Sequence, residues 1–483
     1  MRRSLLTIVL AALSLSLFSQ AQPKPSKISA KQAQEDLDYL YETLQQTHYD
    51  LFVNTEKSVF DKRLKELKAG LKDSVDMLEF HRKVQPFVAL SGLAHCSSEF
   101  PFQSNYGPYI QSGGTLFPFS VAIEGNQAFI TENYSDKEEI EQGDELISLN
   151  GRSITEVMAD IYAHLSGESH YLKNSLINQL EFARVFWLVY DEVKSFELQL
   201  KGKKNGKFYT VKLEAKAAAE MEEHFESKDP LFDYSREFKF IEDVAYLRPG
   251  IFLNQSVEAN TSNHDTFDKS EFVNFIDSSF AQILSTNSEH LIIDLRGNPG
   301  GDNSFSDHML AYFANEPFWF CSEMHVRTSE ITKKFWEGVE LENLQEVRSL
   351  ILNNKNGAQF QVPFGTYDPL PVQERYHGQV YVLIDRYSYS NTVTTAAIIK
   401  DYGFGTLLGE ITADTPTSYG AVHQFPLPHS QINITFPKAL IVRPNGSRNL
   451  IGVRPDFPIQ EIRGNGMDDV LEGTLNFIRN RQQ

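Results

Sequence analysis

The 483-residue sequence is poor in cysteine, in positive charge and in long apolar segments beyond its first residues. Its two cysteines, Cys96 and Cys321, make no disulfide framework, although they could form one bridge in an oxidising compartment. The sequence contains no C-x-x-C pair and no H-E-x-x-H helix, so we expect no metal and no other cofactor. The formal charge of −19 argues against nucleic acid or an anionic membrane as the main partner.

The first residues have the pattern of an export signal. Arg2 and Arg3 give a basic start, an apolar run follows over residues 5–18, and Ser19-Gln20-Ala21 offers a small-x-small cleavage site. This run is short for a membrane span, and a retained N-terminal anchor is the alternative. We therefore expect residues 1–21 to be a signal peptide and the mature protein to be exported, periplasmic or extracellular, without a membrane anchor.

Residues 22–111 are predicted to form a helical cap on a larger unit. Ser29 and Gln32 have the spacing of a capping box at the start of the first helix. Three stripes of apolar residues at helical spacing follow, beginning at Leu37, Phe60 and Met77. The segment then leads into the loop-like stretch around Ser91-Gly92-Leu93-Ala94-His95, which carries a candidate catalytic histidine.

Residues 112–215 change to a period of two and predict a β-rich unit. Asn150-Gly151 is a strong hairpin turn after the apolar strand that follows Gly143-Asp144, and residues 154–165 are helical. This order resembles a PDZ module, in which an extended peptide adds as a strand and backbone N–H groups capture its terminal carboxylate. The resemblance implies a polypeptide partner bound through its C-terminus. Residues 113–117 are a loose candidate for the carboxylate loop, and a spacer that binds no tail is the alternative.

Residues 216–483 predict a mixed α/β domain. The near-continuous apolar runs at 290–295 and 380–385 suit strands buried on both faces, and each leads into a turn and a helix. In such sheets the ligand site lies beyond the carboxyl ends of the strands. The first turn, residues 296–302, has three glycines around one proline, so its unscreened backbone N–H groups could bind an oxyanion. It lacks the P-loop pattern of a nucleotide site.

The second turn contains Ser390 at the start of a helix. A serine there is ordinarily an N-cap, but it can also be a nucleophile whose oxyanion meets the free helix-start N–H groups. The surroundings are not a G-x-S-x-G elbow, so an ordinary α/β-hydrolase is disfavoured. Local features alone leave both roles open.

Taken in order, these motifs resemble the carboxyl-terminal-processing (tail-specific) serine peptidases. The resemblance runs from Asp243 to Pro458: LRGNPGG after one strand, YSYSNT after the next, GE-x-T, and a closing GV-x-PD segment at 452–456. It implies an α/β fold with a crotonase-like (ClpP/crotonase-type) catalytic core, a PDZ-like domain and an N-terminal helical cap. It also implies Ser390 as nucleophile and an oxyanion hole formed by the N–H of Asn391 with that of Gly300 or Gly301.

The sequence lacks the lysine that serves as general base in the best-known branch of that family. Thr415 stands where that branch has its lysine, Asp414 beside it is no base for this purpose, and Lys400 is no positional match. The chain is closer to the tricorn-like branch, which uses a histidine upstream of the PDZ-like module, and His95 matches that motif. The branch orients its histidine with a glutamate at the position of Asn449.

Several alternatives remain open at these positions. An amide such as that of Asn449 can fix an imidazole tautomer, and Glu410 is a second candidate for that role. His423 and His429 are other histidines in the same half of the chain, and Cys96 is a thiol beside His95. The prediction is a serine-type endopeptidase that hydrolyses unfolded or tail-exposed polypeptides through a Ser390 acyl-enzyme. A weakly active or inactive binding protein of this fold and a small-ester hydrolase are the alternatives.

Overall fold

The computed structural model describes residues 26–227, 231–255, 268–338, 345–363, 365–461 and 467–481. The expected signal peptide, residues 1–21, lies outside the described residues. Within those ranges, no helix combines the length and the apolar character needed to cross a bilayer.

The N-terminal part is the predicted helical cap. Ser29 and Gln32 form the capping box, with the Ser29 hydroxyl and the Gln32 side chain each bonded to the other's backbone N–H. The apolar stripes of the three helices pack together with two long strands from the C-terminal half. The elements of this part are β1 (Lys27–Ser29), α1 (Ala30–Thr47), α2 (Lys57–Ala69), β2 (Ser74–Asp76), α3 (Met77–Val88), η1 (Ala89–Ser91), β3 (Ser97–Ser98), η2 (Phe102–Tyr106) and α4 (Gly107–Gln111).

The second part is a β-sheet covered by helices. Its strands are antiparallel in the order β10–β9–β7–β6–β5, and the Asn150-Gly151 turn with positive φ at both residues joins β7 to β8 as the sequence predicts. The helix α8 lies beyond residue 215 but buries Met221 and Phe225 in the same core. The elements are β4 (Thr115–Leu116), β5 (Phe119–Glu124), β6 (Gln127–Asn133), β7 (Glu145–Leu149), β8 (Arg152–Ser153), α5 (Ile154–Ala163), α6 (His170–Leu180), α7 (Phe182–Tyr190), β9 (Ser195–Lys201), β10 (Phe208–Glu214), β11 (Lys216–Ala217) and α8 (Ala218–Ser227).

The third part contains the expected α/β sheet, in the order β12–β13–β14–β17–β18–β21. All neighbours after the antiparallel β12–β13 pair are parallel. Alternate strand residues pack on α10, α11 and α14 on one face and on α15 on the other, which explains the continuous apolar runs. The elements are β12 (Glu237–Ile241), β13 (Val244–Arg248), α10 (Ser270–Thr286), β14 (His290–Asp294), α11 (Asn303–Leu310), β17 (Gln379–Ile384), α14 (Asn391–Tyr402), β18 (Thr406–Gly409), β21 (Phe457–Pro458) and α15 (Asp469–Arg481).

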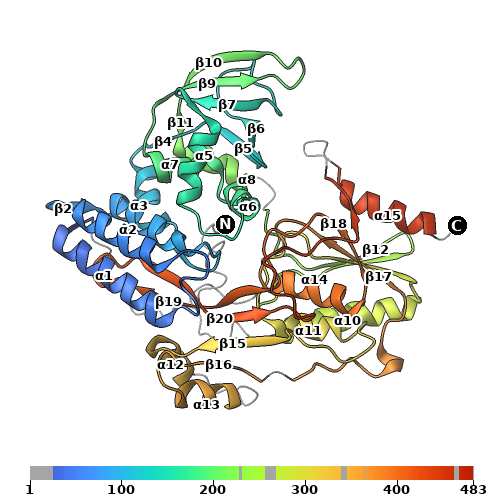
Figure 1. The fold of residues 1–483 in the computed structure, drawn as a ribbon. Coiled ribbons are helices and arrows are strands. Elements are labelled where there is room, and N and C mark those ends of the chain that lie inside the picture. Colours follow the sequence, from blue (N-terminus) through green and yellow to red (C-terminus); the bar gives the residue numbers. More distant parts are fainter. Residues whose placement is uncertain are drawn as a thin grey trace.

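A second antiparallel sheet connects the α/β core to the helical cap, in the order β16–β15–β20–β19, with β3 paired to β20. Figure 1 shows the long β19 and β20 ribbons running from helices α1–α3 toward the core, with the PDZ-like sheet above. This sheet therefore brings the loop that precedes β3, which holds His95, toward the catalytic half. Its elements and neighbours are β15 (Glu323–Arg327), α12 (Glu330–Glu337), α13 (Gln345–Asn353), β16 (Gln359–Gln361), η4 (Val372–Glu374), β19 (Ser418–Pro426) and β20 (Asn433–Val442).

Candidate active site

Ser390 occupies the turn between β17 and α14 in a backbone conformation that is unusual for a serine. Its φ is 54° and its ψ is −124°, and its side chain makes no capping hydrogen bond to the helix. Positive φ is costly for residues other than glycine and tends to occur where function requires it. The Ser390 N–H donates to Asp414 Oδ2 at 2.7 Å, which ties this turn to the loop after β18.

The glycine loop after β14 packs directly against the Ser390 turn. Gly300 has φ of 97°, and a Cβ there would lie 2.8 Å from the Asn391 nitrogen and 2.7 Å from the Tyr389 carbonyl oxygen. Only glycine therefore allows this close approach. Ordinary hydrogen bonds hold the two loops in register: the Tyr389 N–H donates to the Asn298 carbonyl at 2.9 Å, and the Ser388 hydroxyl donates to the Leu295 carbonyl at 2.8 Å.

The predicted oxyanion donors differ in their availability. The Gly300 N–H donates to Asn298 Oδ1 at 3.0 Å, so it is already engaged. The N–H groups of Gly301 and Asn391 donate to no acceptor among the described residues. Of the two glycines named from the sequence, the geometry favours Gly301 as the partner of Asn391 in an oxyanion hole.

His95 lies beside the Ser390 turn, although His95 and Ser390 are almost three hundred residues apart in the sequence. Its ring stacks on that of Tyr389, with centroids 5.6 Å apart and planes at 29°. The side chain is buried, and no described residue hydrogen-bonds to its Nδ1. A bond between the His95 ring and the Ser390 hydroxyl is likewise absent over the described ranges; catalytic hydrogen bonds are often long before substrate binds.

Asp414 provides a carboxylate next to His95, a role that the sequence did not indicate. It accepts the N–H of Thr415 at 2.8 Å as well as that of Ser390. Burial raises the pKa of the Asp414 carboxyl, while the positive charge of His95 and these two N–H groups act against the rise. Asp414 therefore lies within electrostatic reach of the imidazole and can stabilise its protonated form.

The other candidates for a carboxylate or amide partner lie in different surroundings. Asn449 is exposed, and over the described ranges its side chain makes no hydrogen bond; its N–H donates to Ser447 Oγ at 3.5 Å. Glu410 forms an ion pair with Arg386 at 2.5 Å, and Arg386 also bonds Glu124 of the PDZ-like unit at 3.0 Å. The role of Asn449 stays a prediction, and the contacts favour Asp414.

The alternative histidines and thiols are either buried or paired with other residues. His423 is buried against Phe335, and His429 pairs with Glu35 of α1 at 2.8 Å. Cys96 and Cys321 are both buried and free rather than bridged, and burial raises the pKa of each thiol to about 12. A thiol with so high a pKa is a poor nucleophile at neutral pH.

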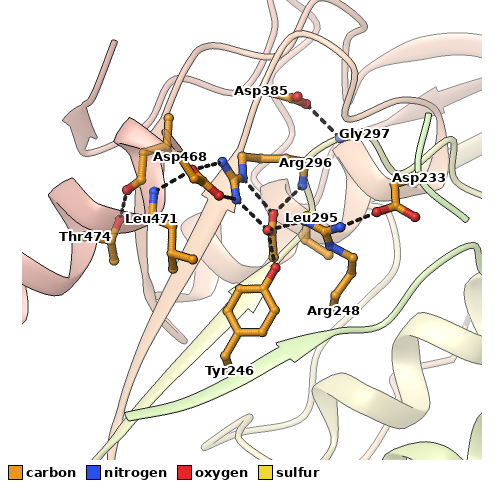
Figure 2. A network of polar contacts seen from close by, with 12 residues as sticks. Asp233, Tyr246, Arg248, Leu295, Arg296, Gly297, Asp385, Asp468, Leu471 and Thr474 are labelled. Carbon is orange, nitrogen blue, oxygen red and sulfur yellow. Dashed lines mark hydrogen bonds and ion pairs between the residues drawn. The ribbon is translucent and has the colours of Figure 1, made fainter. Parts of the chain in front are cut away.

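A buried ion network fixes the start of the glycine loop (Figure 2). Asp294, at the end of β14, accepts from Arg296 Nη2 at 2.7 Å, from Arg248 Nη2 at 2.9 Å and from the Tyr246 hydroxyl at 2.7 Å. Burial alone would raise the pKa of Asp294, but the two guanidinium charges and these bonds hold it well below its usual range. Arg296 extends the network to Asp468 at 2.7 Å, before α15.

Two comparisons with known proteins agree with this architecture. Residues 264–459 match the family model Peptidase family S41, and residues 114–225 match a PDZ domain model. A solved structure of mature CPAF complexed with lactacystin covers 93% of this chain and 97% of its own at 16% identity, with a TM-score of 0.60. A structure of mature CPAF alone covers 93% and 96% at 16% identity, with a TM-score of 0.57. A comparison with curated proteins finds no match.

The match to peptidase family S41, together with the PDZ domain, defines the protein as a serine-type peptidase, a hydrolase. The family of this domain is peptidase family S41, whose model matches residues 264–459. The predicted α/β fold, the PDZ-like unit and the resemblance to carboxyl-terminal-processing peptidases are thereby confirmed. The assignment to the tricorn-like branch stays a prediction.

Proposed function

We propose that the protein is an exported endopeptidase that cleaves unfolded or tail-exposed polypeptides through a Ser390 acyl-enzyme, with His95 as general base. The observation that carries the proposal is the Ser390 turn itself. Its hydroxyl is not used as a helix cap, and its N–H binds Asp414, the carboxylate that lies within electrostatic reach of His95. A base and a carboxylate beside the hydroxyl are what a serine needs to attack near neutral pH.

The chemistry follows from these positions. Ser390 Oγ bonds to the scissile carbonyl carbon while its proton passes to His95, and Asp414 stabilises the resulting imidazolium. The carbonyl oxygen becomes an oxyanion that accepts hydrogen bonds from the N–H groups of Asn391 and Gly301. When the C–N bond breaks, His95 returns the proton to the leaving amine. Water, deprotonated by His95, then hydrolyses the ester and restores the Ser390 hydroxyl.

The substrate and the location of the protein belong to the same proposal. A polypeptide substrate fits a peptidase core joined to a PDZ domain, and its C-terminus would add as a strand to the PDZ-like sheet. The basic and apolar N-terminal residues support export to the periplasm or beyond. The acidic composition suits a protein that does not bind nucleic acid.

A fluorophosphonate probe tests the nucleophile, because it labels only an activated serine. We expect labelling of the wild type, none of Ser390→Ala, and normal labelling of Ser278→Ala, whose exposed serine lies on α10. His95→Ala should lose labelling and cleavage of denatured casein, whereas the exposed His377→Ala should keep both. Equal casein cleavage by Ser390→Ala and the wild type would remove Ser390 from this role.

The same labelling experiment, joined to a binding assay and an ester-cleavage assay, separates the two alternatives. A wild type that is never labelled, yet binds polypeptide, would be an inactive binding protein of this fold. Cleavage of p-nitrophenyl esters without cleavage of any polypeptide would indicate a small-ester hydrolase. Both outcomes would overturn the proposed endopeptidase.

A further inference from the structure

The loop between α5 and α6 of the PDZ-like unit reaches the catalytic residues. Both carboxyl oxygens of Glu168, in this loop, lie 3.3 Å from the N–H of Ala94, the residue before His95. Close by, the hydroxyl of Tyr171 donates to the Ile411 carbonyl at 3.1 Å, in the segment that leads to Asp414. One short part of the PDZ-like unit therefore contacts the loops that carry the base and its carboxylate.

Glu168 is surrounded by groups that belong to the site. The charge of Asp414 acts on it from the loop after β18, and Tyr389 lies within electrostatic reach from the turn before α14. The nearby cation is Lys173 of α6, whose ammonium group donates to the Tyr162 carbonyl at 2.9 Å. Glu168 and Asp414 thus interact electrostatically, and two like charges within reach of each other disfavour double ionisation.

We propose that Glu168 is a positioning residue of the active site, contributed by the PDZ-like unit, which holds the His95 loop through the Ala94 N–H. The inference rests on the proposed function, because it assigns the role of base to His95. It makes the PDZ-like unit a structural component of the catalytic site, whether or not that unit also binds substrate tails.

The protonation state of Glu168 sets the pH range in which this arrangement holds. Burial and the charge of Asp414 raise the pKa of the Glu168 carboxyl to about 8, against the opposing effects of the Ala94 N–H and Lys173. Below that pH the carboxyl is neutral, and its oxygen still accepts the Ala94 N–H. Above it, a second negative charge repels Asp414 and opposes the oxyanion that forms on the substrate.

The test is the pH dependence of fluorophosphonate labelling in the full-length protein. For the wild type we expect the labelling rate to fall with a midpoint at about pH 8, where Glu168 ionises. Glu168→Gln keeps an oxygen acceptor for the Ala94 N–H but cannot ionise, so it should label within about threefold of wild type at neutral pH and lack this fall. Glu168→Ala removes the acceptor and should label about tenfold more slowly at every pH. The exposed Glu132→Gln, in β6 of the same unit, is the charge-matched control and should behave as wild type.

A second measurement does not need activity. Folded Glu168 retains its proton from its ordinary pKa of 4.5 up to about 8, so wild-type stability falls as pH rises through this window. Glu168→Gln lacks this fall. Its Tm relative to wild type should therefore increase between those two pH values and then level off, whereas Glu132→Gln should show no such trend. A Tm difference that does not change with pH would overturn the inference.

The outcomes separate this inference from the proposed function. A wild type that is not labelled at Ser390 refutes the proposed function, and the Tm series still decides the state of Glu168. Normal wild-type labelling with unchanged pH profiles in both Glu168 variants refutes the positioning role alone. A Glu168→Gln variant as slow as Glu168→Ala at neutral pH would also refute it, because the neutral acceptor would then be insufficient.

Discussion

Replacement of Asp414 by asparagine is the sharpest perturbation of the proposed site. The amide has the same shape and can still accept one of the two N–H groups, from Ser390 or Thr415, that the carboxylate binds at 2.7 and 2.8 Å. It removes the negative charge within electrostatic reach of His95. The backbone of the Ser390 turn should therefore survive while the stabilisation of the imidazolium is lost.

The expected loss follows from the role of the carboxylate. In serine–histidine–carboxylate sites the same change lowers kcat by about 10⁴-fold, roughly 5.5 kcal/mol of transition-state stabilisation. Two backbone N–H groups already share the charge of Asp414, and burial raises the pKa of its carboxyl. Both factors weaken the electrostatic effect of Asp414 on His95. We therefore expect a loss of about 10²- to 10⁴-fold in kcat/KM, or roughly 2.7–5.5 kcal/mol.

The assay is cleavage of a quenched fluorescent peptide, with the fluorophosphonate labelling rate as a second readout. Asn449→Ala is the matched control, because Asn449 is exposed and should keep activity within about threefold of wild type. Thermal unfolding of both variants checks that neither effect comes from lost stability. If Asp414→Asn stays fully active while Asn449→Ala loses about a hundredfold or more, our assignment of the carboxylate is refuted and the partner of His95 is Asn449.

Three further predictions concern the loops and thiols around the site. Gly300→Ala should abolish labelling and cost about 1–3 kcal/mol of stability, measured by chemical denaturation. The reason is that Gly300 has φ of 97° and that a Cβ there would meet the Ser390 turn. Full activity of the variant would show that the close approach is not needed. Arg296→Met should cost up to about 3–5 kcal/mol, because it removes one of the two guanidinium charges that compensate the buried Asp294. The stabilising contribution of Asp294 is present above its ordinary pKa of 3.8 and is lost as pH falls through its lowered value. An acid titration of Tm should therefore be shallower in the variant than in wild type. Cys96 and Cys321 should not react with a thiol reagent at mildly alkaline pH until the protein unfolds, because burial raises the pKa of both thiols to about 12. Rapid reaction of the folded protein would contradict their burial.

The sequence predicts the catalytic half well because its signals are local. The apolar runs of β14 and β17 lie in parallel strands buried on both faces, and their length and composition alone indicate this. The glycine loop and the Ser390 turn then meet because the carboxyl ends of neighbouring parallel strands share one edge of the sheet. Position in an ordered set of motifs also singled out His95, whose ring stacks on Tyr389 beside Ser390, and its role as base stays a prediction.

The carboxylate near His95 was not predictable from the same kind of signal. Asp414 follows β18 in an irregular loop, and its electrostatic interaction with His95 depends on how β19 and β20 carry the helical cap against the core. Glu168 was missed for the same reason, since its contact with Ala94 joins two units of the chain. Long-range contacts between loops leave no period and no fixed spacing in a sequence, so only the folded chain identifies them.

The ambiguity of Ser390 shows what backbone geometry adds to sequence. An N-cap serine needs extended backbone angles so that its hydroxyl can reach the N–H groups of the first turn. At φ of 54° Ser390 is not extended, and carbonyl groups serve that turn: the Thr392 N–H bonds to the Tyr389 carbonyl at 3.1 Å, and the Val393 N–H to the Ser390 carbonyl at 3.0 Å. The hydroxyl is left unused by the helix, and the N–H of Asn391 has no acceptor among the described residues. A cap would engage the hydroxyl with the N–H of Thr392 or Val393, so the turn that strains Ser390 also leaves its hydroxyl available beside the unbonded Asn391 N–H, as the proposed function requires.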